Sequence, residues 1–502
     1  MLVTVGLLLS AIVALYFYLT WNFDYWKKRN VPGPDPLPLV GNFPAFFRRN
    51  RPVMEEKYQI YRDYGSKYNF VGIFTNRSPQ IFITSPGLAR DILVKYFKNF
   101  HDNEIGLITN KELDPLFGRN PFVLNGAAWK AKRAEMTPAF TASRIKALYF
   151  NVEDVCATMT KYIKERAGSS IEMKELGDRF TTDVVSSCIF GADAQSFIHD
   201  DAEIREMGSK LMDSSFLFVL KMSVMTVLPS VAKLFNISLV SRPREMFFIK
   251  LMSEAIRHRE ASSEKRLDYL DYLSTLKRQK HISELDMAAN GVTFFLDGNE
   301  TSSATLTLTL YEVAKQPDIQ KRLREELLKA SNEDGTIACD ALSELPYLEQ
   351  VFSESLRLWP PVTFMSKVCT DRIELELTAN RRVPIERGTC AIISNWSLHR
   401  DPTYYEDPLT FNPDRFAPEK GGIYPYREKG CYMPFGDGPR QCLGMRFGRM
   451  QVKRGIFEII RNFEISVDSQ TRNPLRIVSS PAISLGLSGV WLNFKPIGNK
   501  LY

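Results

Sequence analysis

The run FGDGPRQCLG, residues 435–444, constrains the fold of this chain more than any other segment. A cysteine that follows a glycine turn and a Pro-Arg pair can present a thiolate to a metal, and Arg440 can reach an anionic group. Gly436 and Gly438 can adopt backbone angles closed to other residues and let the chain approach a flat ligand. The next stretch, MRFGRMQVKRGIFEIIRNF, has helical apolar spacing. Cys442 is therefore predicted at a helix start, where the dipole and free amides stabilise a thiolate.

The N-terminus predicts a membrane anchor. Residues 1–23 carry no charge, and about 20 helical residues cross a hydrocarbon core of ~30 Å. Aromatic residues suited to the interface, among them Tyr25 and Trp26, precede the basic run 27–29, so the body is expected on the cytoplasmic side. A cleaved signal peptide is the alternative, but no basic n-region precedes the apolar stretch. Residues 24–42, with four prolines, are predicted to be a stiff linker.

Composition indicates one large mixed domain over residues 43–502. Short β-rich runs occur at 58–97 and 366–395, whereas 129–358 is mostly helical by periodicity, so we predict a mainly α (α+β) fold. The net charge of +7 is too diffuse to indicate nucleic-acid binding. The seven cysteines show no CxxC pair, so neither a disulfide framework nor a zinc site is indicated.

An apolar segment, residues 214–240, is interrupted by Lys221 and Pro229 and is a poor second membrane span. Two readings stay open. It is either a buried core helix or a pair of helices that covers a pocket and contacts the bilayer.

A helix is predicted over residues 283–315. It places the acid Glu300 beside the hydroxyl of Thr301, and Gly298 lies two residues before Glu300. Gly298 has no Cβ and permits close approach of a planar ligand. A threonine hydroxyl can bond the carbonyl one turn back and loosen the local helix, and the resulting groove can relay protons. A Ser/Thr-rich helix with a solvated acid is the alternative.

Two further pairs share helix faces. Glu354 and Arg357 are three residues apart, and Trp129 and Arg133 are four apart. An exposed Glu-Arg pair would contribute only a few tenths of a kcal/mol.

Together these segments, which occur in the expected order along essentially the whole chain, resemble the cytochrome P450 family. The resemblance implies that Cys442 is the axial ligand of haem b (iron protoporphyrin IX), with Phe435 and Gly436 in the cofactor-binding loop. The thiolate would push electron density onto the iron and favour O–O cleavage, and the turn amides would tune its potential.

The resemblance also assigns roles on the 283–315 helix. Gly298, Glu300 and Thr301 match the oxygen-activation motif, with Glu300 and Thr301 delivering protons. Asp297 stands where the family usually has Ala or Gly. Fatty-acid ω-hydroxylases of the superfamily carry a Glu there that can form an ester with a haem methyl. Because a desolvated carboxylate is unfavourable unless paired or protonated, we predict a functional Asp297.

By the same resemblance, Trp129, Arg133 and Arg440 meet the haem propionates. Lys367 stands where related microsomal forms often have Arg and keeps the charge without the bidentate fork. Glu354 and Arg357 would form a buried network with Arg415. His399 is equally consistent with a haem contact or a structural role.

The resemblance implies a monooxygenase anchored in the endoplasmic reticulum, most like insect microsomal forms. It would insert one atom of O₂ into lipophilic xenobiotics or endogenous lipids or hormones, with electrons from NADPH through a separate FAD/FMN reductase. The resemblance also allows cytochrome b5 as a second electron donor. A docking face for the reductase is expected from the cations Lys130, Lys132, Arg446, Arg449, Lys453 and Arg454. The alternatives are a reductase-independent isomerase or dehydratase, and a membrane haem sensor or carrier.

The substrate pocket is expected along residues 101–124, 208–220, 294–301, 362–366 and 481–487. These segments do not identify a molecule.

Overall fold

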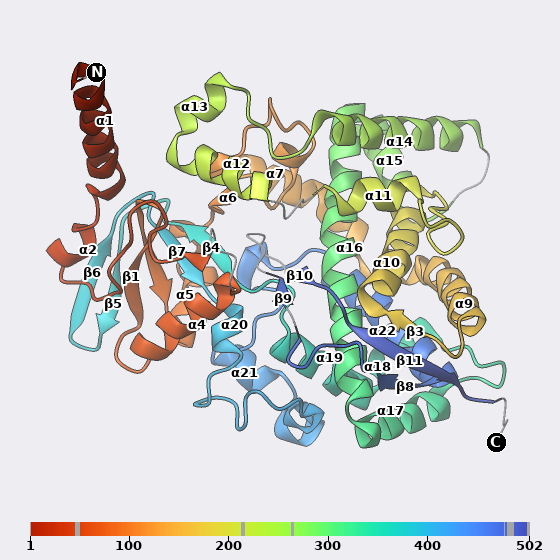
Figure 1. The fold of residues 1–502 in the computed structure, drawn as a ribbon. Coiled ribbons are helices and arrows are strands. Elements are labelled where there is room, and N and C mark those ends of the chain that lie inside the picture. Colours follow the sequence, from red (N-terminus) through yellow and green to blue (C-terminus); the bar gives the residue numbers. More distant parts are fainter. Residues whose placement is uncertain are drawn as a thin grey trace.

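The long helix α16 (Glu284–Ala314) runs through the helical part of the protein (Figure 1). The computed structural model describes residues 2–45, 51–211, 216–262, 266–475, 477–478 and 486–498. The predicted helix over 283–315 is present as α16, and its N-cap is Ser283, whose hydroxyl accepts from the amide of Asp286 at 3.0 Å. Helices α10 (Met173–Phe190), α14 (Arg242–Ala261), α19 (Pro346–Leu358) and α22 (Met445–Asn462) pack around it, so apolar faces from distant parts of the chain share one core.

Shorter helices complete the helical part. They are α7 (Gly126–Met136), α8 (Ala142–Ala147), α9 (Tyr149–Glu165), α11 (Glu203–Ser209), α12 (Phe216–Val227), α13 (Pro229–Leu234), α15 (Tyr269–Lys280), α17 (Pro317–Ala330) and α18 (Cys339–Glu344). The remaining helices are α1 (Leu2–Thr20), α2 (Tyr25–Lys28), α4 (Val53–Tyr64), α5 (Pro86–Leu93), α6 (Ile105–Ile108), α20 (Asn395–Leu398) and α21 (Tyr424–Glu428).

The smaller β-rich part is built around a four-stranded sheet of order β1-β2-β7-β4. β1 (Phe70–Thr75) and β2 (Ser78–Ile83) form a hairpin, and β2 pairs in parallel with β7 (Cys390–Ile393), which pairs with β4 (Met365–Val368). Its strands come from the two β-rich runs of the sequence, which confirms the mainly α fold with a smaller β part. The other strands are β3 (Ser170–Glu172), β5 (Ile373–Thr378), β6 (Arg381–Ile385), β8 (Phe463–Val467), β9 (Ile477–Val478), β10 (Gly486–Leu487) and β11 (Trp491–Pro496).

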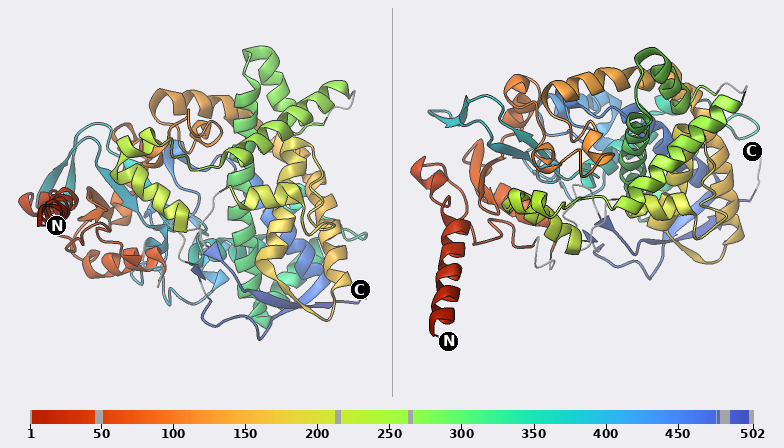
Figure 2. Two further views of the ribbon diagram at one scale, coloured as in Figure 1. Left: turned by 45° about the horizontal axis from the view of Figure 1, so that its top comes forward. Right: turned by 90° about the horizontal axis from the view of Figure 1, so that it is seen from above.

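Helix α1 projects from the body and is the one candidate membrane span among the described residues (Figure 2). Its window Val3–Thr20 is apolar and has no residue buried in the protein. The hydroxyl of Tyr18 donates to the carbonyl of Val227 at 3.0 Å, so α1 contacts the end of α12.

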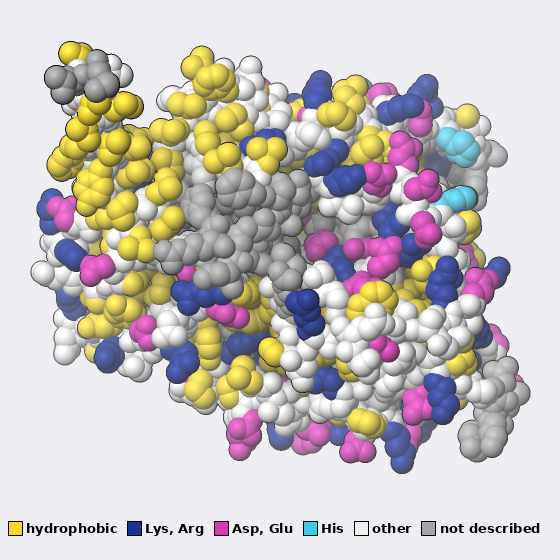
Figure 3. All heavy atoms as spheres, in the orientation of Figure 1, with side chains coloured by type: hydrophobic (Ala, Val, Ile, Leu, Met, Phe, Trp, Pro, Cys, Tyr) yellow, Lys and Arg dark blue, Asp and Glu magenta, His cyan; other side chains and the backbone are white. Residues whose placement is uncertain are grey.

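Helices α12 and α13 settle one of the open alternatives for segment 214–240. Apolar side chains gather over α1, α12 and α13 on one face (Figure 3). The large hydrophobic residues exposed on the described part of the α12–α13 segment are Leu217, Leu220, Leu228, Val231, Leu234 and Phe235. In its described residues, the segment is therefore a surface helix pair and not a buried core helix.

Trp26 corrects the sequence-based account of the interface. Trp26 was expected in the aromatic belt, yet it is only 3% exposed and its indole donates to the carbonyl of Ile73 at 3.2 Å. A Cβ on Gly72 would lie 2.3 Å from the indole ring, so the glycine makes room for it. The start of the predicted linker is thus packed on the sheet, because the indole finds both an apolar pocket and an acceptor there.

Two truncations separate the membrane helix from the packed segment behind it. Removing residues 2–20 should release much of the protein from membranes while retaining haem, with residual binding through α12 and α13. Removing residues 2–26 also deletes Trp26 and should lower the free energy of unfolding by ~3–5 kcal/mol. Membrane sedimentation and denaturant unfolding check both outcomes. Equal stability of the two truncations would show that Trp26 is not part of the core.

Candidate active site

A cavity of ≈ 750 Å³ lies between α7, α10, α16 and the Cys442 loop. Every residue predicted for the site lines it: Trp129, Arg133, Asp297, Gly298, Glu300, Thr301, Lys367, Phe435, Gly436, Arg440 and Cys442. Its walls also include the predicted segments 101–124, 208–220 and 362–366 in part, whereas residues 481–485 lie outside the described residues. Residues of 144–148 and 267–272 contribute as well, and no sequence pattern indicated them.

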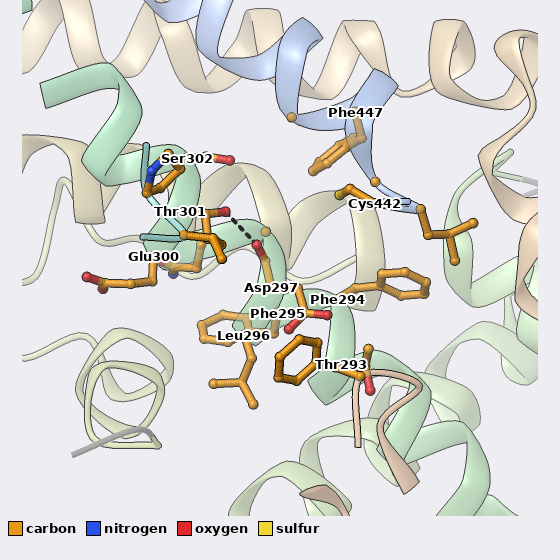
Figure 4. A pocket seen from close by; sticks show the side chains of 18 of the residues that line it. Thr293, Phe294, Phe295, Leu296, Asp297, Glu300, Thr301, Ser302, Cys442 and Phe447 are labelled. Carbon is orange, nitrogen blue, oxygen red and sulfur yellow. Dashed lines mark hydrogen bonds between the residues drawn. The ribbon is translucent and has the colours of Figure 1, made fainter. Parts of the chain in front are cut away.

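The Cys442 loop has the tight geometry that its glycines predict. Gly436 and Gly438 have φ of +70° and +67°, and a Cβ on Gly438 would lie 2.1 Å from the carbonyl oxygen of Leu93. The Cys442 amide donates to the carbonyl of Phe435 at 2.9 Å and closes the turn. The cysteine is thereby held just before α22, with its side chain open to the cavity (Figure 4).

The thiol of Cys442 does not gain its acidity from the helix. Surrounding protein raises its pKa to about 11 by burial, and the carboxyl of Asp297 adds to the rise. The Gly444 amide and Arg133 act in the opposite direction but are outweighed. The expected thiolate stabilisation by the helix start is therefore insufficient alone. A coordinating metal deprotonates a thiol outright, which makes the thiolate a property of the metal-bound site.

Three cations line the cavity near the loop. Arg440 bonds the carbonyls of His101 (2.5 Å), Pro121 (3.2 Å) and Leu124 (2.9 Å), and its guanidinium lies 4.3 Å from the ring centroid of Trp129. Arg133 donates to the carbonyl of Gln441 at 2.8 Å.

Lys367 is the third cation. It donates to Oδ1 of Asn103 at 2.7 Å, and burial followed by the nearby Arg440 charge lowers its pKa to about 7. Buried cations that repel one another favour an anionic ligand between them.

These residues fit a haem group. Of the two cysteines that line the cavity, Cys188 is buried and Cys442 is exposed to the cavity space, and the three cations could neutralise two carboxylates. Cys442 would bind the iron, and Arg133, Arg440, Lys367 and Trp129 would hold the propionates. Gly298 constrains the site less than expected, since an added Cβ would make ordinary contacts of 3.5 Å with Val185 and 3.9 Å with Phe447.

Helix α16 presents the acid-hydroxyl pair as predicted. The hydroxyl of Thr301 donates to the carbonyl of Asp297 at 2.7 Å, one turn back. Glu300 points away from Cys442 (Figure 4) and accepts from Nζ of Lys174 at 3.1 Å. Lys174 also bonds Asp178 at 2.5 Å, and Asp178 accepts from Ser303 at 2.6 Å.

Sequence reasoning missed Lys174. Its i,i+4 spacing with Asp178 predicts only a surface ion pair, yet its side chain is 13% exposed and reaches across to α16. Although burial alone lowers the pKa of Lys174, the carboxylates of Asp178 and Glu300 raise it above its ordinary value. Lys174 therefore stays charged and orients Glu300.

Asp297 faces the cavity beside Asn120, which lies in the predicted pocket segment 101–124 but was assigned no role from the sequence. Burial raises the pKa of Asp297 to about 7, and a hydrogen bond from the Asn120 side chain opposes the rise. Oδ1 of Asn120 accepts from the Phe122 amide at 2.7 Å, so its amide nitrogen is the atom left to face Asp297. The carboxyl is thus oriented from one side and free to meet a ligand on the other.

One open alternative is decided and one expectation needs correction. His399 is structural: it is fully buried, its Nδ1 bonds the carbonyl of Arg357 at 3.2 Å, and its Nε2 accepts from the Met433 amide at 3.1 Å. Four of the six cations expected to dock a reductase have internal partners. Lys132 bonds Glu135, Arg449 and Lys453 share Glu349, and Arg454 pairs with Glu458. Lys130 and Arg446 remain exposed.

The sequence profile of the Cytochrome P450 family matches residues 31–488. The chain is 38% identical to Probable cytochrome P450 28d1 of Drosophila melanogaster over 97% of both chains. It is 36% identical to Cytochrome P450 6a2 of the same organism, over 98% of this chain and 99% of the relative. It is 33% identical to Cytochrome P450 6k1 of Blattella germanica, over 97% of this chain and 96% of the relative.

This chain belongs to the cytochrome P450 family and is a haem-thiolate monooxygenase. When bound, the thiolate-ligated iron supplies the activation of O₂ and the transfer of one oxygen atom to carbon. The protein supplies the apolar cavity, the fixed thiol, the cations of the haem rim and the acid-hydroxyl pair of α16.

Substituting Cys442 tests the ligand assignment. Cys442→Ala should abolish the red-shifted Soret band of the reduced, CO-bound protein, since no thiolate then reaches the iron. Cys431→Ala is the matched control, because Cys431 is fully buried and hydrogen-bonded to the Tyr426 carbonyl away from the cavity. Loss of the band in the Cys431 variant, with retention in the Cys442 variant, would reverse the assignment.

Proposed function

We propose that this protein inserts oxygen into lipophilic small molecules, xenobiotics or endogenous lipids, at the cytoplasmic face of the endoplasmic reticulum. Electrons would come from NADPH through a separate FAD/FMN reductase. The observation that carries the proposal is the large cavity, lined mostly by apolar side chains, onto which Cys442 and Thr301 both open. Exposed apolar residues of α1, α12 and α13 on one face support contact with a membrane from which such substrates could enter.

Thr301 and Glu300 would have separate roles in proton delivery. The Thr301 hydroxyl holds the Asp297 carbonyl and offers an oxygen at the cavity wall, where it can position water. Glu300 takes the outer position, held by Lys174, and exchanges protons with solvent through its partly exposed carboxylate. Protons would pass from Glu300 through water to Thr301.

Reductase docking would use exposed cations around the Cys442 loop. Lys130 and Arg446 remain from the original set. Purified protein should oxidise lipophilic substrates when combined with a flavoprotein reductase and NADPH, with lower rates as ionic strength rises. Product formed from hydroperoxides alone, with none under reductase supply, would support the isomerase or dehydratase alternative.

Thr301→Ala should retain haem and the CO spectrum but uncouple NADPH use from product, with hydrogen peroxide released instead. The physical reason is that the cavity wall loses the hydroxyl that positions water. NADPH oxidation, peroxide and product are measured together. Thr309→Ala is the matched control, because Thr309 makes the same bond to a carbonyl one turn back, at 2.6 Å, but is not in the cavity wall. Unchanged coupling in the Thr301 variant would remove it from the proton path.

Asp297 should select substrates through a hydrogen bond or ion pair at the cavity wall. Its pKa of about 7 means that it is neutral below this pH and ionised above it. The affinity for a lipophilic amine, relative to a neutral compound of the same shape, should therefore rise as pH rises through about 7. Asp297→Asn should remove this dependence. Spectral titrations of both compounds from pH 6 to 8 measure the effect.

Covalent attachment to haem is the competing role for Asp297. Mass spectrometry of the denatured holoprotein decides it, since haem that remains attached to the chain establishes an ester. The shorter reach of Asp ranks the ester below hydrogen bonding. If haem content, selectivity and pH profile are all unaltered in the Asn variant, Asp297 has no part in the active site.

A further inference from the structure

Two buried carboxylates join segments that lie far apart in the sequence on the cavity's covered side. Asp114 belongs to the pocket loop, residues 110–120, and Glu245 lies in the first turns of α14, directly after the lid segment, residues 216–241. Asp114 is 0% exposed and Glu245 is 1% exposed. Carboxylates are seldom buried without a specific partner, so their contacts indicate what they hold.

The contacts are reciprocal. Oδ1 of Asp114 accepts from the amides of Leu239 at 2.8 Å and Val240 at 2.9 Å, where the lid segment ends. Oε1 of Glu245 accepts from the amide of Leu116 in the pocket loop, at 3.4 Å. The pocket loop therefore supplies a carboxylate to two backbone donors at the end of the lid segment, and α14, which follows the lid segment, supplies one to a backbone donor of the pocket loop.

The joined segments form part of the cavity wall. Phe117 and Asn120 of the pocket loop and Phe218, Met222 and Leu239 of the lid segment line the cavity. Separating the two segments would open the cavity between them. Asp114 and Glu245 are buried charges whose bonds cross this contact, which marks the two carboxylates as the points where separation is controlled.

We propose that Asp114 and Glu245 form a carboxylate clamp that holds the lid segment against the pocket loop, and that its release admits ligands to the cavity. Release exposes both carboxylates to water and frees three backbone amides to bond with it. The hydration of the carboxylates offsets the lost hydrogen bonds, so the clamp can open without unfolding the helices.

The clamp is proton-sensitive because its two acids are buried together. Burial raises the pKa of Asp114 to about 6 and, with the Asp114 charge as a further cause, that of Glu245 to about 7. The charged groups that face them are Lys221 on α12 and Arg242 on α14, and both oppose the rise. Oδ2 of Asp114 is buried without a hydrogen-bond partner, so nothing else compensates its charge.

The direction of the pH effect follows. The closed clamp has raised pKa values, so it is favoured at low pH and loses stability as pH rises through about 6 to about 7. Ligand access should become faster over the same range. This pH dependence does not involve the substrate or the electron donor. The clamp proposal can therefore be wrong while the proposed function is right, and the proposed function can be wrong while the clamp proposal is right.

The test uses the haem-loaded full-length protein and 1-phenylimidazole, whose binding to haem iron shifts the Soret band. Stopped-flow mixing gives its association rate. Asp114→Ala removes the acceptor for two amides and should raise association and dissociation rates several-fold together, with little change in Kd. Hydrogen exchange at Leu239 and Val240 should accelerate in this variant.

The pair Asp114→Asn with Glu245→Gln keeps both acceptor oxygens and removes the titration. The ratio of its association rate to that of the wild type should differ between pH 6 and pH 8. Taking this ratio at each pH cancels the effect of the probe's own protonation on the rate. Asp286→Ala is the matched control: Asp286 pairs with Arg119 of the same loop at 3.3 Å, but from α16 and partly exposed, so access should not change. The clamp is overturned if Asp114→Ala leaves both the association rate of 1-phenylimidazole and the hydrogen exchange unaltered. It is also overturned if the ratio of the double variant's association rate to that of the wild type is the same at pH 6 and pH 8.

Discussion

The buried side chain of Arg357 is the interaction on which the haem-side scaffold depends. Its guanidinium bonds both oxygens of Glu354, at 2.7 and 2.8 Å, and the carbonyls of His399, Pro408 and Thr410. Arg415 completes the network on Glu354 at 3.2 Å. A buried charge is tolerated only when every donor has a partner, and losing one partner costs ~3–5 kcal/mol. The loop 399–415 is therefore fixed by the arginine and not by secondary structure.

This constraint extends to the thiol through His399. Burial and the neighbouring arginine charges lower the pKa of His399 to about 3, so the ring is neutral, donates from Nδ1 to Arg357 and accepts at Nε2 from Met433. Met433 lies two residues before Phe435, whose carbonyl closes the Cys442 turn. A continuous set of bonds thus runs from α19 to the Cys442 loop, so the buried pair predicted from sequence is connected to the cysteine.

Sequence reasoning located the fold and the long helix, and the residues that it predicted for the site line one cavity, because these depend on local spacing and on motifs. It failed where a side chain's partner comes from a distant segment. Trp26 has the composition of an interfacial aromatic, but the space beside Gly72 is visible only in the folded sheet. Lys453 and Arg454 look like surface cations, yet they are 3% and 5% exposed and paired with acids from other turns and helices. Lys174 was missed, and Asn120 was assigned no role, for the same reason.

The charges around Cys442 are arranged for a ligand that carries charge of both signs. The protein alone disfavours the thiolate, because burial and Asp297 raise the pKa of the cysteine. It also holds Lys367 beside Arg440, which lowers the pKa of that lysine. Haem would relieve both conflicts at once, since Cys442 would bind its iron as a thiolate and the cations would be neutralised by its carboxylates. Because these contacts exist only in the folded chain, binding free energy becomes folding free energy, and the helices that frame the cavity are stabilised by the cofactor they enclose.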